Sequence, residues 1–189
     1  MELATARLRV GLLHPDDADA LFAYRADPVV ARFQGWCPAD VAEVRGFIDR
    51  QSTAPVPTGW FQRAIRLCDG NRLIGDLGVN LPEEATDPVE FGISIAPAHQ
   101  GSGYAGEVLQ ALFGQVFGPW KRHRIHASVD PRNAASMAML RGAGMRQEAH
   151  HRESLWLRGE WVDDVIFALL SREWRQMAGD DEPRTAPSC

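Results

Sequence analysis

A short glycine-rich segment between an apolar strand and an apolar helix constrains the fold of this chain most. Residues 89–95 alternate Val, Phe and Ile with small or polar residues, which predicts a strand that ends at Pro97. Residues 104–117 carry apolar side chains at helical spacing, and Gly101 and Gly103 lie in the turn before them. Such a turn lets an anion approach the free N–H groups at the start of a helix. The segment is therefore typical of a phosphate-binding loop.

Two other phosphate motifs do not fit this segment. It lacks the Gly-Lys-Ser/Thr end of a P-loop, and no acidic residue follows about 20 positions on, as a dinucleotide site requires. Taken alone, the turn Gly101-Ser102-Gly103 is equally compatible with an ordinary tight connection between a strand and a helix. The nature of the anion therefore has to come from the rest of the chain.

The remaining pattern predicts strands and helices that alternate irregularly. Asp69-Gly70-Asn71 is a hairpin turn signal between two of the strands. The fold class that follows is α+β, with a mostly antiparallel sheet and inserted helices. The predicted strands are 8–12, 60–67, 73–80, 89–95, 125–129, 144–150 and 161–170, and the predicted helices begin near 14, 38, 104 and 133.

Length and composition limit the kind of protein. The 189 residues suit one domain, residues 1–178, and the segment 179–189 lacks an apolar pattern and is expected to be a disordered tail. Apolar runs fall far short of the ~20 residues of a membrane span, so no membrane partner is expected. The net charge of −5 argues against nucleic acid as a partner. Three cysteines without metal-ligand spacing fit a reducing, cytoplasmic location.

The glycine-rich segment and a second one downstream resemble the landmarks of the GCN5-related N-acetyltransferases (GNAT). Asn133 and Ser136, followed by Gly144-Met145, resemble the family's second landmark, Asn-x-x-Ser before a Gly-Phe-like turn. The likeness extends over nearly the whole chain and is greatest to the ribosomal-protein alanine and serine N-terminal acetyltransferase branch. The first landmark, Gln/Arg-x-x-Gly-x-Gly/Ala, is matched by Gln100, Gly101, Ser102, Gly103, Tyr104 and Ala105.

The resemblance implies a fold, a cosubstrate and a binding mode. The fold is the GNAT fold, a six- to seven-stranded sheet splayed into a V and flanked by about four helices. Acetyl-CoA would lie in the V, without a metal, and transfer its acetyl group directly to a primary amine. Its pantetheine arm would pair with Ile93, Ser94 and Ile95, its pyrophosphate would bind at the glycine-rich loop, and Asn133 would hold the pantetheine or the local loop.

The resemblance also suggests two catalytic residues. Ser136 is a candidate to donate a proton or hydrogen bond to the departing thiolate, although Ser is also favoured at helix starts as a cap. Glu90 begins the strand that leads into the motif and is a candidate base acting through water, although a charged strand end facing solvent is the alternative. The pair His150-His151 has no third ligand at useful spacing, so no metal site is expected.

The acceptor side is expected to include Phe33, Trp36 and Trp156, although both tryptophans also suit ordinary packing. The resemblance leaves the amine open between a protein N-terminus, a small amine and an aminoglycoside-like acceptor. It also implies homodimers, for which the strands within residues 155–170 are the candidate interface. The alternative function is a non-catalytic module that binds or senses acyl-CoA.

Overall fold

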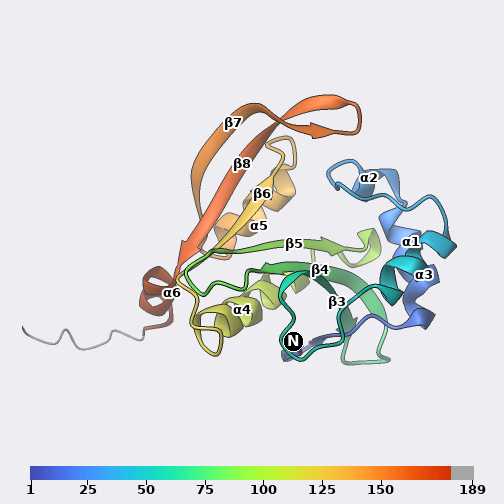
Figure 1. The fold of residues 1–189 in the computed structure, drawn as a ribbon, viewed down its shortest axis with the longest axis horizontal. Helices are drawn as coiled ribbons and strands as arrows, with labels where there is room; N and C mark the ends of the chain where they lie inside the picture. The colour runs from blue at the N-terminus through green and yellow to red at the C-terminus, as the bar shows by residue number, and fades with distance from the viewer. Residues whose placement is uncertain (180–189) are drawn as a thin grey trace, which may run out of the picture.

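The computed structural model describes residues 1–179, which form one twisted eight-stranded sheet with helices on both faces (Figure 1). Neighbouring strands are antiparallel except β5 and β6, which are parallel. The order across the sheet is β1-β2-β3-β4-β5-β6-β8-β7. The strands are β1 Leu3–Ala4, β2 Leu8–Gly11, β3 Gly59–Leu67, β4 Leu73–Leu81, β5 Val89–Ile95, β6 Arg124–Val129, β7 Arg146–Leu157 and β8 Glu160–Leu170.

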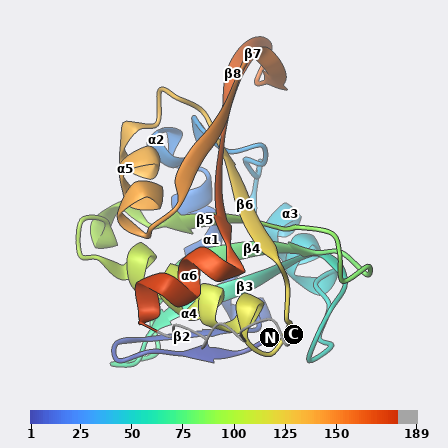
Figure 2. The same ribbon diagram turned by 90° about the vertical axis from the view of Figure 1, so that its left-hand side faces the viewer.

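Two apolar clusters hold the helices against opposite faces of the sheet (Figures 1 and 2). Ile65 belongs to the larger cluster, with α4, α5 and α6, whereas its neighbour Ala64 belongs to the smaller one, with α1 and α3. Successive side chains of a strand point to opposite faces, so the two clusters lie on the two sides of the sheet. The helices are α1 Ala18–Arg25, α2 Pro28–Ala31, α3 Val41–Asp49, α4 Tyr104–Phe117, α5 Ala134–Gly142 and α6 Ser171–Ala178, with 3-10 turns η1 Pro15–Asp17 and η2 Pro97–His99.

The sheet opens into a V between β5 and β6. These strands pair only through Val89 with Ile125 and Glu90 with His126, whereas β4 stays paired with β5 as far as Ile95. Beyond Glu90, one edge of β5 is therefore free while β6 continues alongside β8, and the two halves of the sheet diverge (Figure 1). The splayed α+β fold implied by the resemblance is confirmed.

Several elements differ from the sequence-based expectation. The two-residue strand β1 brings the sheet to eight strands rather than six or seven. The helices α2 and α6 were not predicted, and both are short, with four and eight residues. The strand β7 runs on to Leu157, so β7 and β8 form a long hairpin that projects from the rest of the sheet (Figure 2). The expected tail beyond Gly179 lies outside the described residues.

No helix within residues 1–179 combines the length and apolarity that crossing a membrane requires.

Candidate active site

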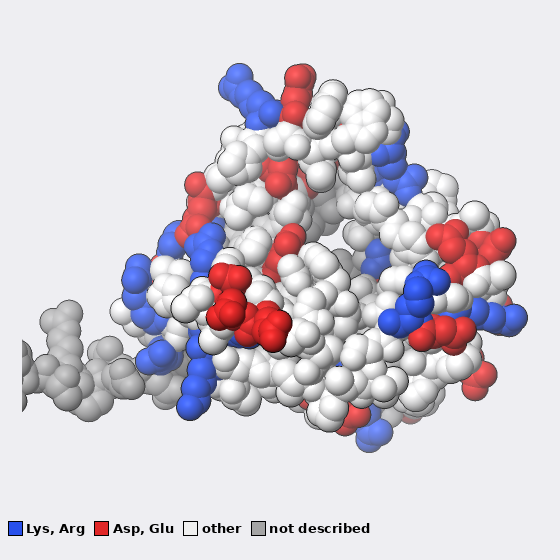
Figure 3. Space-filling model, in the orientation of Figure 1, with Lys and Arg blue, Asp and Glu red and all other residues white. Residues whose placement is uncertain are grey.

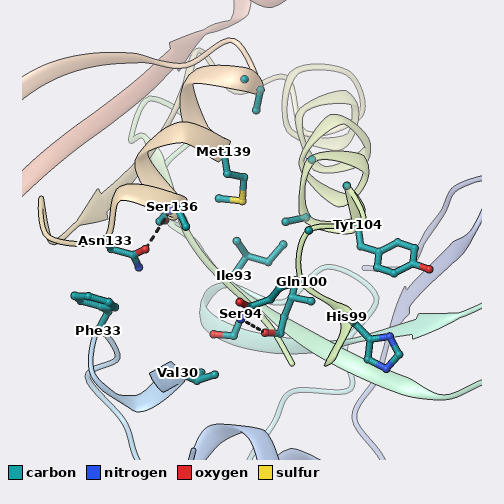
Figure 4. Close-up of a pocket in the computed structure, with 18 of the residues that line it drawn as sticks. Val30, Phe33, Ile93, Ser94, His99, Gln100, Tyr104, Asn133, Ser136 and Met139 are labelled. Carbon is teal, nitrogen blue, oxygen red and sulfur yellow. Dashed lines mark hydrogen bonds between the residues drawn. The ribbon is translucent and has the colours of Figure 1, made fainter. Parts of the chain in front are cut away.

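A cavity of about 770 Å³ lies where the V opens, between the end of β5, the start of α4, the start of α5 and α2 (Figure 4). Eleven of the residues singled out in the sequence line it together: Phe33, Ile93, Ser94, Ile95, Gln100, Gly101, Gly103, Tyr104, Ala105, Asn133 and Ser136. None of the described residues that line it is Lys, Arg, Asp or Glu. An anion bound here would therefore meet backbone N–H groups and the positive end of the helix dipole rather than a basic side chain lining the cavity.

The glycine-rich loop has the backbone conformation that an anion site needs. Gly101 and Gly103 have φ values of 75° and 78°, a left-handed conformation that favours glycine. Gly103 is the N-cap of α4 and provides no side chain to bond the first amides of the helix. The side-chain amide of Gln100 donates to the Ile95 carbonyl at 2.9 Å and ties the loop to the end of β5. The N–H groups of the first turn of α4 thus face the cavity without a capping side chain.

The two polar residues at the start of α5, Asn133 and Ser136, have different roles. The Asn133 side chain caps the helix by accepting a hydrogen bond of 3.1 Å from the backbone N–H of Ser136. The Ser136 side chain takes no part in that cap, and both residues face the cavity (Figure 4). Asn133 alone meets the need for a helix cap, so the Ser136 hydroxyl is available to a ligand.

The strand β5 presents a buried polar group to the cavity. The Ser94 hydroxyl is buried and has no hydrogen-bond partner among the described residues. An unpartnered buried hydroxyl costs about 1–3 kcal/mol, so such groups in folded proteins usually have a ligand or water as partner. Glu90, on the same face four residues earlier, does not line the cavity and lies 3.9 Å from His126, measured between Oε2 and Nε2.

The two candidate tryptophans do not line the cavity. Trp36 stacks on Phe47 with ring centroids 4.3 Å apart and donates a hydrogen bond of 2.7 Å to Glu43. Trp156 lies on the β7–β8 hairpin, 58% exposed, in an edge-to-face pair with Trp161. The geometry of Trp36 is that of packing, and that of Trp156 is an exposed aromatic pair. Ser102 also does not line the cavity, although its neighbours in the loop do.

Sequence reasoning missed the contribution of α2 to the wall of the cavity. Val29 and Val30 line it, followed by Gln34 in the next loop. Asp27 caps this short helix by accepting from the Val29 N–H at 2.8 Å, and Pro28 occupies its first position. An Asp-Pro pair is a helix-start signal that was available in the sequence. The structure also adds His99, Gly106, Gln110, Ala135, Met139, Gly142 and Ala143 to the lining.

A buried ion pair anchors the loop after α2 to the sheet. Asp76 of β4 pairs with Arg25 of α1 and also accepts hydrogen bonds from Tyr24, at 2.6 Å, and from Gln62. The side chains of Arg25 and Asp76 are 7% and 1% exposed. The Arg25 guanidinium also donates to the Gln34 side chain at 2.9 Å. Burial, together with the charge of Asp76, raises the pKa of Tyr24 well above its usual range. The network thus connects the core to one wall of the cavity.

A second set of polar contacts anchors the glycine-rich loop to the N-terminal strands. Glu107 of α4 accepts hydrogen bonds from the Thr5 hydroxyl at 2.5 Å and the Arg7 backbone N–H at 3.0 Å, and pairs with the Arg7 guanidinium at 2.6 Å. Arg7 also donates to the Ser102 carbonyl at 3.1 Å and lies over the Tyr104 ring. We call the contacts among Thr5, Arg7 and Glu107 the loop staple. Partial burial opposes ionisation of Glu107, but the hydrogen bonds from Thr5 and Arg7 lower its pKa overall.

Within residues 1–179, no group of three or more His, Cys, Asp or Glu side chains is arranged to hold a metal ion. His150, which invited a metal interpretation, instead contacts Asp163 at 2.7 Å on the β7–β8 hairpin.

Comparisons with known proteins agree with this geometry. The family model of the acetyltransferase (GNAT) domain matches residues 7–146. The uncharacterized N-acetyltransferase p20 of Bacillus licheniformis is 28% identical over 91% of this chain and 97% of its own length. The ribosomal protein uS5-alanine N-acetyltransferase of Escherichia coli is 32% identical over 44% of this chain and 43% of its own length. The crystal structure of a GNAT-family acetyltransferase from Bacillus anthracis, 24% identical, has a TM-score of 0.82 and covers 91% of this chain and 99% of that one. Since the family model spans well over half of the chain, the protein belongs to the GNAT family and is an N-acetyltransferase.

Proposed function

We propose that this N-acetyltransferase binds acetyl-CoA in the cavity at the opening of the V and transfers the acetyl group directly to a primary amine. One observation carries the proposal. The free edge of β5, the uncapped start of α4 and the free hydroxyl of Ser136 all face the same cavity. GNAT acetyltransferases use acetyl-CoA, and each of these three features suits a different part of that molecule.

The extended pantetheine arm suits the free edge of β5. Beyond Glu90 this edge has no strand partner, and backbone groups from Ile93 to Ile95 are positioned to pair with an added extended chain. The pyrophosphate suits the amides from Gly101 to Ala105, where the positive end of the α4 dipole compensates for the absence of a basic side chain in the lining.

The same residues are suited to the chemistry of acetyl transfer. The acceptor ammonium first loses a proton, which we assign to Glu90 through intervening water, and the free amine then attacks the thioester carbonyl. The developing oxyanion would be stabilised by donors near Ile93 and Ser94 on β5. As the carbon–sulfur bond breaks, the thiolate accepts a proton or hydrogen bond from Ser136. The products are the acetylated amine and free CoA thiol.

The acceptor amine would enter from the side of α2. The space-filling view shows a hollow between the β7–β8 hairpin and the α1–α2 end of the molecule (Figure 3). Val29, Val30 and Phe33 give this side of the cavity an apolar wall. A protein N-terminus, a small amine and an aminoglycoside all remain candidates. The uS5-alanine N-acetyltransferase relative favours placing peptides that begin with alanine first in the panel.

The role of Ser136 is tested by Ser136→Ala. We expect turnover to fall about 10- to 100-fold, because a hydrogen bond to a charged group contributes about 1.5–3 kcal/mol and each 1.4 kcal/mol corresponds to a factor of ten. The dissociation constant for acetyl-CoA, measured by calorimetry, should stay the same. Ser154→Ala, on the exposed hairpin, is the matched control. Unchanged turnover with normal affinity in Ser136→Ala would remove this serine from the mechanism.

The function as a whole is tested by acetyl-CoA calorimetry followed by thiol release against peptides, small amines and aminoglycosides. Binding with release for one acceptor class would support the proposal and name the substrate class. Binding without release from any acceptor would favour the acyl-CoA-sensing module. Absence of binding would contradict the proposed use of the cavity.

A further inference from the structure

Glu90 of β5 and His126 of β6 are register partners at the point where these two strands part. They are partners in the second of the two residue pairs that join these parallel strands, so their side chains lie on the same face of the sheet. The Nε2 atom of His126 is 3.9 Å from Oε2 of Glu90. Both side chains are partly exposed, 22% for His126 and 32% for Glu90. The pair lies outside the cavity lining, with Glu90 four residues before Ser94 along β5, and is partly open to solvent.

One ring nitrogen of His126 lacks a hydrogen-bond partner within residues 1–179. Its Nδ1 atom is buried and has no hydrogen-bond partner among the described residues. A buried ring nitrogen without a partner is unfavourable by about 1–3 kcal/mol, which indicates that water or a substrate group completes the site. A structural histidine in a sheet would more commonly have both nitrogens bonded or exposed. The unpartnered Nδ1 atom, together with a carboxylate 3.9 Å from the other ring nitrogen, Nε2, separates this pair from an ordinary surface ion pair.

Burial favours the neutral form of the His126 ring. Burial lowers the pKa of His126 below its ordinary value of 6.5, and Arg124 on β6 acts in the same direction. Glu90 on β5, Asp164 on β8 and the Val89 carbonyl oppose this shift but do not cancel it. The net shift lowers the pKa of His126 and so favours the uncharged ring. Taking up a proton would convert a carboxylate beside a neutral ring into an ion pair, which the carboxylate stabilises.

We propose that His126 accepts, together with Glu90, the proton that the acceptor amine releases before it attacks the thioester. This inference rests on the proposed function and adds a residue to it. Glu90 lies four residues before Ser94 on β5, a distance of roughly 13 Å along the strand, so water has to carry the proton from the amine to the pair. The ammonium loses one proton, which passes through water to the Glu90–His126 pair, and the exposed edge of the pair releases it to solvent. The amine lone pair forms the new carbon–nitrogen bond.

The inference is tested by the pH dependence of kcat in His126→Gln with a saturating amine. Glutamine retains polarity and approximate size but takes up no proton. We expect kcat at pH 7 to fall about 100-fold, within the range of general-base contributions, and to approach the wild-type value as pH nears the pKa of the free amine. The affinity for acetyl-CoA should not change. The control is His123→Gln, in the exposed turn just before β6.

Two outcomes would overturn this inference without contradicting the proposed function. One is a His126→Gln variant with the wild-type pH profile and kcat. The other needs no variant of His126: an NMR titration of the wild-type protein in which this ring is already protonated at pH 7. Glu90→Gln should lower the pKa of His126 in the same titration, because the carboxylate stabilises the imidazolium. A wild-type protein that releases no thiol with any amine would instead overturn the proposed function, and this inference with it.

Discussion

Asp76→Ala is expected to lower the free energy of unfolding by about 3–5 kcal/mol, the usual effect of removing one partner of a buried ion pair. The substitution leaves the Arg25 guanidinium, 7% exposed, without its carboxylate. It also removes the acceptor of the Tyr24 and Gln62 hydrogen bonds. Urea denaturation followed by circular dichroism measures the change, which is a large share of the stability of a domain of this size.

The network around Asp76 also leads to an expectation about function. Arg25 holds Gln34 in the wall of the cavity, so a folded Asp76→Ala protein should show a raised KM for the acceptor amine. Asp69→Ala, in the exposed turn between β3 and β4, is the matched control and should change stability by no more than about 0.5 kcal/mol. A loss below about 1 kcal/mol in Asp76→Ala would show that the pair is replaceable by solvent.

Glu107→Gln is expected to lower kcat/KM for acetyl-CoA about 10- to 100-fold and to leave kcat/KM for acetyl-pantetheine, which lacks the pyrophosphate, nearly unchanged. Glu107 is the acceptor at the centre of the loop staple, and its side chain is 18% exposed. Each hydrogen bond to its charge contributes about 1.5–3 kcal/mol, and their loss frees the loop from the N-terminal strands. The truncated thioester does not use that loop. Parallel kinetics with the two donors measures the difference.

The control for this experiment is Glu83→Gln, in the exposed loop after β4. Equal losses for both donors would assign Glu107 to general stability rather than to the phosphate site. The staple should also weaken in acid. The pKa of Glu107 is lowered in the folded protein, so its contribution is complete above the usual pKa and is lost as pH falls through the folded value.

The strand, loop and helix around the proposed phosphate site could be predicted from the sequence. The predicted strand 89–95 and helix 104–117 coincide with β5 and α4. The signals there are local: alternation of apolar residues, glycines that adopt positive φ, and helix periodicity all act within a few residues of each other. The same holds for Asn133, whose type and position predicted a helix start.

The contacts that complete the site could not be read from the chain, because they join residues far apart in sequence. Arg7 and Glu107 are separated by 100 positions, and Arg25 and Asp76 by 51. The pairing of Glu90 with His126 depends on the register of two parallel strands with a helix between them. Trp36 and Trp156 fitted an acceptor site by residue type, yet one packs on Phe47 and the other projects on a hairpin.

What the sequence by itself determined about this protein is therefore the family and the backbone of its glycine-rich loop. The tertiary structure decided which charges are buried together, which polar atoms are left without partners, and which aromatic side chains reach the cavity. The physical reason is the range of the interactions: backbone conformation is governed by neighbours along the chain, whereas burial and pairing are governed by neighbours in space.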